Sequence, residues 1–194
     1  MSLATVKTAP DAYAVEPTEK YLFLDFDGPM HPTTTLQGKN VALLASSPSA
    51  LREAGFFVWA DALEQLLAQA EADHCGALRI NVVVHSSWRA QPWFSTPVIR
   101  QALGALGDRI CGFTRSELPR GQAVEDTCER MGIEDYVVLD DDIDAFRDCP
   151  MVQQHLIAVS PLRGVCDDAV ASSLSQWAHA VYAAPSGTPS PSQY

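Results

Sequence analysis

The sequence has few cysteines, and they are not arranged to hold a fold together. The five cysteines are an odd number, are widely spaced and form no C-x-x-C pair. We therefore expect neither a disulfide framework nor a structural zinc site, and a reducing compartment, the cytoplasm, is the simplest location. Long apolar runs are also absent. No stretch approaches the roughly 18 residues of a membrane span, and residues 1–13 lack the apolar core of a secretion signal, so no membrane contact is expected.

Basic side chains and glycine-rich motifs are scarce as well. Thirteen lysines and arginines stand against 24 aspartates and glutamates, which gives a net charge of −11. A strong nucleic-acid-binding surface is not expected because phosphate contacts need clustered Lys and Arg, although a local basic pocket fits this balance. No G-x-G-x-x-G follows an apolar run, and Gly38-Lys39 lacks the Walker spacing. These absences exclude a dinucleotide-binding oxidoreductase and a P-loop nucleotide triphosphatase.

The composition is that of one globular domain. The chain has 194 residues, of which 47% are hydrophobic and 19% charged, and a chain of this length buries enough surface to fold without a covalent or metal staple. Its two ends differ from the middle. Residues 1–19 show no period and are predicted to be a flexible N-terminal segment, and the Pro/Ser-rich residues 184–194 a disordered tail. The folded domain is predicted to span residues 20–183.

Short apolar runs, typical of strands buried on both faces, alternate with helical patterns along this domain. The predicted strands are residues 21–24, 78–84, 109–113, 136–139 and 155–159, and the predicted helices are residues 60–72, 97–106, 121–131 and 167–182. This alternation predicts an α/β fold, a Rossmann-like doubly wound, mostly parallel five-stranded sheet with helices on both faces. Residues 32–58 fit the scheme poorly and are interpreted as a small insertion or flap, an irregular excursion or small hairpin over one end of the sheet.

Acidic residues follow two of the predicted strands. The first strand runs into Asp25-Phe26-Asp27-Gly28, in which two carboxylates two residues apart project to the same side and glycine allows a sharp turn. The alternative is an ordinary Asp-Gly turn. In doubly wound sheets, ligands bind at the carboxyl ends of the strands, which makes this position informative.

The fourth strand ends in the cluster Asp140-Asp141-Asp142-Ile143-Asp144. Two unit charges about 4 Å apart repel by about 4 kcal/mol at an effective dielectric near 20, so gathering these carboxylates beside Asp25 demands a cation. Hard oxygen ligands of this kind suit Mg²⁺. The alternative is a solvated acidic loop, but the position directly after an apolar strand favours a metal site.

Two further positions suit a phosphate. The second strand ends in His85-Ser86-Ser87-Trp88-Arg89, where a hydroxyl and free backbone N–H groups can bind a phosphoryl oxygen, or simply form a Ser-rich turn. Arg120 opens the helix before the fourth strand, and as a fixed cation it would neutralise phosphate and carboxylates, unless it is an ordinary surface arginine. His31 and His85 lie near the expected pocket and are interpreted as loop or packing histidines.

The four segments YLFLDFDGPMHP, VVVHSSWR, RGQAVEDTCERMG and YVVLDDD occur in the order of the four motifs of the haloacid dehalogenase (HAD) superfamily. More narrowly, the chain resembles the HAD-type domain of Swiss Army Knife RNA repair proteins, over residues 21–182. The resemblance implies an HAD-like fold with a minimal cap, since residues 32–58 are too short for a sizeable one. It also implies a phosphatase that needs Mg²⁺.

The resemblance also implies roles for individual residues. Asp25 would attack phosphorus and form an aspartyl-phosphate, and Asp27 would act as general acid and base. Ser86, or alternatively Ser87, would hold the phosphoryl group, and Arg120 would stand at the position of the family's Lys or Arg. The implied ligands of Mg²⁺ are Asp25, Asp140, Asp141 and the backbone carbonyl of Asp27, with Asp142 and Asp144 as weaker candidates. Gly28 and Arg89 would line the substrate site, where Arg89 either touches substrate or braces the loop.

The expected function is therefore Mg²⁺-dependent hydrolysis of a phosphomonoester. The substrate would be a phosphorylated small molecule or, because a small cap leaves the site open, a bulky molecule such as a nucleic-acid terminal phosphate. A phosphoacceptor receiver domain does not fit, because no Asp follows the third predicted strand. The remaining alternative is a non-catalytic HAD-like module that binds a ligand or partner. Such a module is expected to lose Asp25 or Asp27, and both are present.

Overall fold

The computed structural model of the protein describes residues 17–180. Its sheet has five strands, all parallel, in the order β3-β2-β1-β4-β5. The strands are β1 (Thr18–Leu24), β2 (Leu78–Val84), β3 (Ile110–Phe113), β4 (Tyr136–Asp140) and β5 (Leu156–Ala158). The predicted doubly wound, five-stranded α/β fold is confirmed. The first strand begins at Thr18 rather than Tyr21, so residues 18 and 19 belong to the sheet and not to a flexible segment.

The remainder of the segment predicted to be flexible (1–16) and the predicted tail (184–194) lie outside the described residues. So do the last residues of the predicted domain and of its last helix. The assignment of residues 20–183 to a single catalytic domain stays a prediction. None of the helices within residues 17–180 has both the length and the apolar character needed to cross a membrane.

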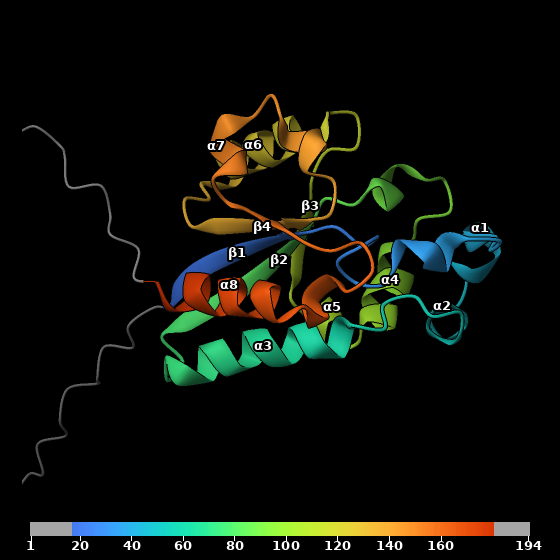
Figure 1. Ribbon diagram of the computed structural model, residues 1–194, viewed down its shortest axis with the longest axis horizontal. Helices are drawn as coiled ribbons and strands as arrows, with labels where there is room; N and C mark the ends of the chain where they lie inside the picture. Colours follow the sequence, from blue (N-terminus) through green and yellow to red (C-terminus); the bar gives the residue numbers. More distant parts are fainter. Residues whose placement is uncertain (1–16, 181–194) are drawn as a thin grey trace, which may run out of the picture.

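Helices cover both faces of the sheet (Figure 1). Below it in that view lie α3 (Ala60–Asp73) and α8 (Asp168–His179), which pack side by side, and above it lie α6 (Arg120–Met131) and α7 (Pro150–Gln153). Successive residues of a buried strand point to opposite faces. Accordingly, Leu22 and Leu24 belong to the core under α3 and α8, whereas Phe23 packs with the residues of α6 and α7.

One predicted helix is interrupted. The pattern over residues 97–106 predicts a single helix, but the structure has α4 (Thr96–Leu103) and α5 (Ala105–Asp108). The break occurs at Gly104, whose φ of +64° lies in the left-handed region that favours glycine. Gly107, expected just beyond the helix end, lies inside α5, where a Cβ atom would come within 2.0 Å of the Arg100 carbonyl oxygen.

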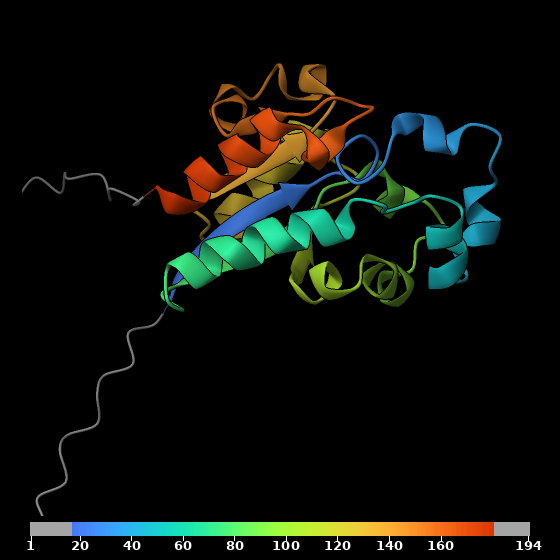
Figure 2. The ribbon, with the colours of Figure 1, turned by 60° about the horizontal axis from the view of Figure 1, so that its bottom comes forward.

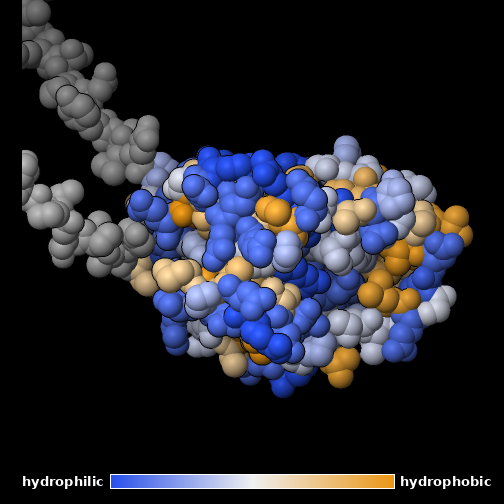
Figure 3. All heavy atoms as spheres, turned by 90° about the horizontal axis from the view of Figure 1, so that it is seen from above, coloured by the Kyte–Doolittle hydropathy of each residue, from blue (hydrophilic) through white to orange (hydrophobic). Residues whose placement is uncertain are grey.

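The insertion at residues 32–58 contains short helical segments joined by turns, so the alternative of a small hairpin is wrong. It contains a 3₁₀ turn, η1 (Thr33–Leu36), and two short helices, α1 (Val41–Leu44) and α2 (Pro48–Glu53). Ser47 caps α2 by accepting the Ala50 N–H at 3.3 Å. This cap favours a helix although the apolar residues of the segment show only a weak helical period. The insertion extends beyond the carboxyl ends of the strands (Figure 2). Apolar surface gathers at this end of the molecule (Figure 3), where Leu43 of α1 is 74% exposed.

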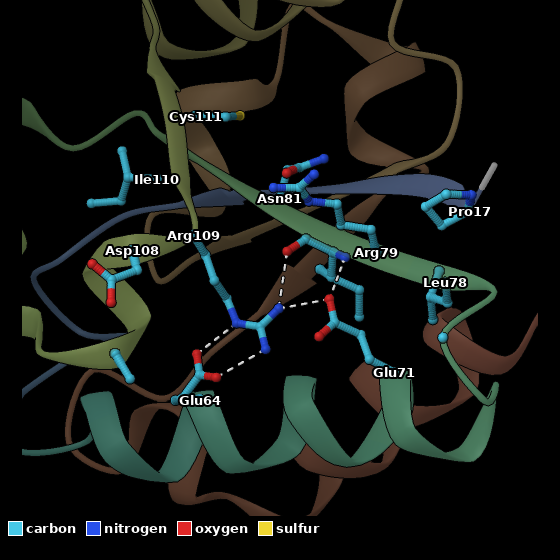
Figure 4. Close-up of a pocket in the computed structure, with 13 residues that line it drawn as sticks. Pro17, Glu64, Glu71, Leu78, Arg79, Asn81, Asp108, Arg109, Ile110 and Cys111 are labelled. Atoms are coloured by element: carbon cyan, nitrogen blue, oxygen red, sulfur yellow. Dashed lines mark hydrogen bonds and ion pairs between the residues drawn. The ribbon is translucent and has the colours of Figure 1, made fainter. Parts of the chain in front are cut away.

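On the β3 side of the sheet, β2 begins before the short β3 does, and side chains contact the part of β2 that β3 does not cover (Figure 4). The Ile80 N–H donates to Glu71 Oε1 at 2.7 Å, and Arg109 Nη1 donates to the Ile80 carbonyl at 3.2 Å. Arg109 also binds Glu71 at 2.7 Å and holds Glu64 through two hydrogen bonds of 2.6 and 2.9 Å. These contacts fasten α3 to the sheet beside an open cavity of about 650 Å³.

Candidate active site

The candidate site lies where β1, β2 and β4 end. Leu24 of β1 is in register with Val84 of β2 and with Leu139 of β4, so the residues that follow these three positions meet at one edge of the sheet. Asp25 continues the ladder, and its N–H donates to the Leu139 carbonyl at 3.1 Å. Its side chain is 1% exposed, and its Oδ1 accepts the Phe26 N–H at 2.7 Å.

The predicted convergence of acidic residues is present. Asp25, Asp140 and Asp141 each offer a carboxylate oxygen, and these three atoms lie within 4.8 Å of one another. Asp142 and Asp144, the weaker candidates, are not part of this group. The Asp142 N–H donates to Asp140 Oδ1 at 2.8 Å, and Asp144 forms an exposed ion pair with Arg147.

Arg120, the first residue of α6, lies between two of these carboxylates. Its Nη1 is 3.0 Å from Asp25 Oδ2 and 2.8 Å from both oxygens of Asp140. The helix begins here because Pro119 precedes it in an extended conformation. The side chain of Arg120 points at the carboxyl ends of β1 and β4. One positive charge therefore faces three negative ones, which leaves the buried cluster with an excess of negative charge.

The electrostatics of the cluster reflect this excess. Burial, reinforced by the charge of Asp25, raises the pKa of Asp140 to about 7 even though Arg120 opposes the shift. Burial likewise raises the pKa of Asp25 and, followed by repulsion from Asp25, that of Asp141. All three carboxyls are thus harder to ionise than free ones. A bound cation would relieve both the desolvation and the mutual repulsion.

Gly28 allows Asp141 to reach this cluster. The loop of residues 27–31 closes on itself through a hydrogen bond from the Gly28 N–H to the His31 carbonyl at 3.0 Å. Gly28 has φ of +86°, and a Cβ atom on it would lie 2.5 Å from Asp141 Cγ. The glycine is therefore needed for space and for backbone conformation. Its predicted contact with substrate stays a prediction.

Asp27 does not belong to the group of three carboxylates and has partners of its own. Its Oδ2 accepts the indole N–H of Trp88 at 2.8 Å, and its Oδ1 lies 3.0 Å from His31 Nε2. The side chain is 19% exposed, so the carboxyl group stays within reach of a molecule at the mouth of the site. The prediction that its backbone carbonyl binds the metal stays a prediction.

The two serines after β2 are placed differently. Ser86 is fully buried and its Oγ accepts the Trp88 N–H at 3.4 Å, while Ser87 is exposed at the start of η2 (Ser87–Ala90). Arg89 folds back onto the main chain and donates to four carbonyl oxygens, those of His85, Ser86, Thr114 and Arg115. Of the two readings of Arg89, these contacts match the one in which it braces the loop.

Comparison with known proteins agrees with this arrangement. Residues 21–170 match the family model described as the HAD domain in Swiss Army Knife RNA repair proteins. The chain belongs to this family. The family membership predicted from four short motifs is thereby confirmed, over most of the chain. No curated protein and no solved structure matches it.

The acidic group of this HAD domain fits a divalent cation. Its three carboxylates are close enough to share one ion, two of them are buried, and their charge exceeds that of Arg120. Carboxylate oxygens are the ligands of hard cations such as Mg²⁺ and Ca²⁺. Asp25, Asp140 and Asp141 would therefore hold a metal in the HAD domain, and they are the three side chains among the ligands expected from the sequence.

Three side chains of the HAD domain lie against Asp27 or Asp140 but were not expected to belong to the site. His31 and Trp88 bind Asp27, and His85 lies behind Asp140. Burial, with the charges of Arg120 and Arg89, lowers the pKa of His85 to about 3. His85 is thus neutral, so its Nδ1, 3.6 Å from Asp140 Oδ2, forms no ion pair. The sequence offered one indication that His31 and Trp88 belong to the site, namely that each lies within a few residues of a motif: His31 follows the Asp25 motif and Trp88 follows Ser86.

Proposed function

We propose that the chain is a Mg²⁺-dependent phosphohydrolase that removes the phosphoryl group of a phosphomonoester by way of an aspartyl-phosphate on Asp25. The observation that carries this proposal is the meeting of Asp25, Asp140 and Asp141 within 4.8 Å beside Arg120. A buried carboxylate next to a fixed cation and a metal-binding group is what phosphoryl transfer requires, namely positioning and neutralisation of charge.

In the first step, a carboxylate oxygen of Asp25 attacks phosphorus. The bond from phosphorus to the leaving oxygen breaks with its electron pair, and the carboxyl group of Asp27 gives that oxygen a proton. In the second step, the Asp27 carboxylate takes a proton from water as the water attacks phosphorus. The bond to Asp25 then breaks, which restores both carboxyl groups and releases inorganic phosphate.

Three other groups support these steps. Ser86, buried directly after β2, would donate its hydroxyl to a phosphoryl oxygen. Arg120 Nη1, which now bridges Asp25 and Asp140, would share its charge with the incoming phosphate. Mg²⁺, when bound by Asp25, Asp140 and Asp141, would neutralise the transferred group and hold it in place.

For the substrate, we propose a terminal phosphate on a bulky molecule such as a nucleic-acid end. The insertion contains helices of only four and six residues, which make a small cap, and the family is named for RNA repair. Recognition would centre on the terminal phosphate. The exposed arginines of the loops at this end, Arg115, Arg147 and Arg163, each contact an aspartate and add little net positive surface.

The test is phosphate release from nitrophenyl phosphate and from RNA oligonucleotides phosphorylated at either end, with Mg²⁺ and with chelator. We expect Mg²⁺-dependent release that Asp25→Asn abolishes. Ser86→Ala should reduce kcat/KM by at least about tenfold, as loss of a donor to the phosphoryl group does, whereas Ser87→Ala is the matched control and should stay near the parent. An absence of hydrolysis across such a panel would leave a HAD domain that binds a ligand or partner without turnover.

A further inference from the structure

Both oxygens of the Asp27 carboxylate are held by side chains that the steps above do not use. Trp88 donates its indole N–H to Oδ2 at 2.8 Å, and His31 Nε2 lies 3.0 Å from Oδ1. Both partners are buried, whereas Asp27 itself is partly exposed. A carboxylate oxygen can accept more than one hydrogen bond, so these contacts fix the orientation of Asp27 and still allow proton exchange on its open side.

The direction of the His31 contact is set by the insertion. The Phe57 N–H donates to His31 Nδ1 at 3.5 Å, so Nδ1 is the acceptor and Nε2 carries the proton that faces Asp27. Phe57 has φ of +57°, a conformation uncommon for a bulky residue. The rings of Phe56 and Phe57 also pack edge-on against His31, with centroids 5.0 and 5.7 Å away.

The indole of Trp88 is fixed in the same way. Its ring contacts Phe26 at 5.7 Å, Phe56 at 5.3 Å and Trp93 at 5.3 Å between centroids. Because aromatic rings on several sides hold the indole, its N–H has one direction, toward Asp27. Phe56 touches both His31 and Trp88, so the end of the insertion completes the packing around both donors.

We propose that His31 and Trp88 are positioning residues that aim the Asp27 carboxyl group at the leaving oxygen, and that the insertion at residues 32–58 maintains this aim through Phe56 and Phe57. This inference rests on the proposed phosphohydrolase activity. A proton is transferred efficiently only when donor and acceptor are aligned within hydrogen-bond reach. The insertion thereby acts on the chemistry as well as on access to the site.

The test uses leaving groups that differ in their need for a proton. Departure of alkoxide from an alkyl phosphate requires protonation, whereas dinitrophenolate leaves without it. We expect Trp88→Phe, which keeps the ring and removes the N–H, to lower kcat/KM for an alkyl phosphate by about tenfold or more. The kcat/KM for dinitrophenyl phosphate should stay within about twofold to threefold of the parent, because that constant covers only the steps through formation of the phosphoenzyme.

The matched control is Trp177→Phe. It removes another indole N–H donated to a carboxylate, that of Asp135 at 2.9 Å, which immediately precedes β4 and lies at the opposite end of that strand from Asp140. This variant should change neither constant. An equal loss on both esters in Trp88→Phe, or equal behaviour of the two Trp variants, refutes the positioning role.

A second pair of variants tests His31. His31→Leu should repeat the selective loss on the alkyl phosphate, and His31→Gln, whose amide can donate in place of Nε2, should recover part of it. A failure of His31→Gln to exceed His31→Leu contradicts the inference. If the parent hydrolyses neither ester, the proposed function falls and this inference with it. If the parent hydrolyses both and the variants lose both equally, the inference alone falls.

Discussion

Substituting the buried nucleophile should make the metal-free protein more stable. In Asp25→Asn, one negative charge leaves a group whose carboxylate oxygens lie within 4.8 Å of one another. At about that separation and an effective dielectric near 20, each pair of charges repels by about 3.5 kcal/mol, and Asp25 belongs to two such pairs. The lost attraction to Arg120 Nη1, 3.0 Å away, is about 5.5 kcal/mol on the same scale.

The balance favours the variant by about 1–2 kcal/mol, and the desolvation of a carboxylate that is only 1% exposed adds to it. We expect a gain of about 2 kcal/mol in the free energy of unfolding, which for a domain of this size raises Tm by roughly 4–8 °C. The cost is function, since the same substitution removes the proposed nucleophile.

The assay is thermal unfolding followed by circular dichroism, with chelator and then with Mg²⁺, at a pH above the value of about 7 to which the pKa of Asp140 is raised. In Mg²⁺ the parent should gain more than Asp25→Asn, because a ligand that binds only the folded state stabilises it. Asp108→Asn, at an exposed carboxylate of α5, is the control and should change little. A lower Tm for Asp25→Asn than for the parent in chelator refutes the reasoning.

Two further predictions concern Gly28 and the edge of β2. Gly28→Ala and Gly76→Ala both place a side chain at φ above +80°, at a cost of about 1–2 kcal/mol each. Only Gly28→Ala should also weaken Mg²⁺ binding in a calorimetric titration, because its Cβ displaces Asp141; equal affinities would contradict this. Burial alone raises the pKa of Glu71, but hydrogen bonds from Arg109 and a backbone amide outweigh it and lower the value below 4.5. The ion pair of Glu71 and Arg109 therefore stabilises the fold above pH 4.5, and this stabilisation is lost as the pH falls and Glu71 is protonated. Arg109→Gln should flatten the acid limb of stability measured by urea unfolding, and a curve parallel to that of the parent would refute the assignment.

Much of the site could be predicted because a parallel sheet fixes where strand ends meet. Asp25 and Asp140 each follow an apolar run, and two adjacent parallel strands bring those positions together whatever the loops do. The choice between Ser86 and Ser87 required the structure. Burial runs without alternation from Ile80 through Ser86 and ends at Ser87, where η2 begins, so no periodic pattern marks which serine is buried.

The partners of Asp27 could not be predicted, because they depend on the course of loops. His31 returns to Asp27 through the closed turn at Gly28, and Phe57, in an unusual conformation, fixes its ring. The helices of the insertion and the break at Gly104 were missed for a related reason. Short helices owe their stability to packing and caps rather than to an extended period, so a periodic pattern neither detects nor divides them reliably.

The side-chain hydrogen bonds to the uncovered part of β2 bear on aggregation at high protein concentration. An uncovered strand invites the strand of another molecule to pair with it, which is a common beginning of aggregation. At Ile80 both backbone groups on that side are already occupied, by Glu71 and by Arg109. At this position an approaching chain finds charged side chains in place of a free amide and a free carbonyl.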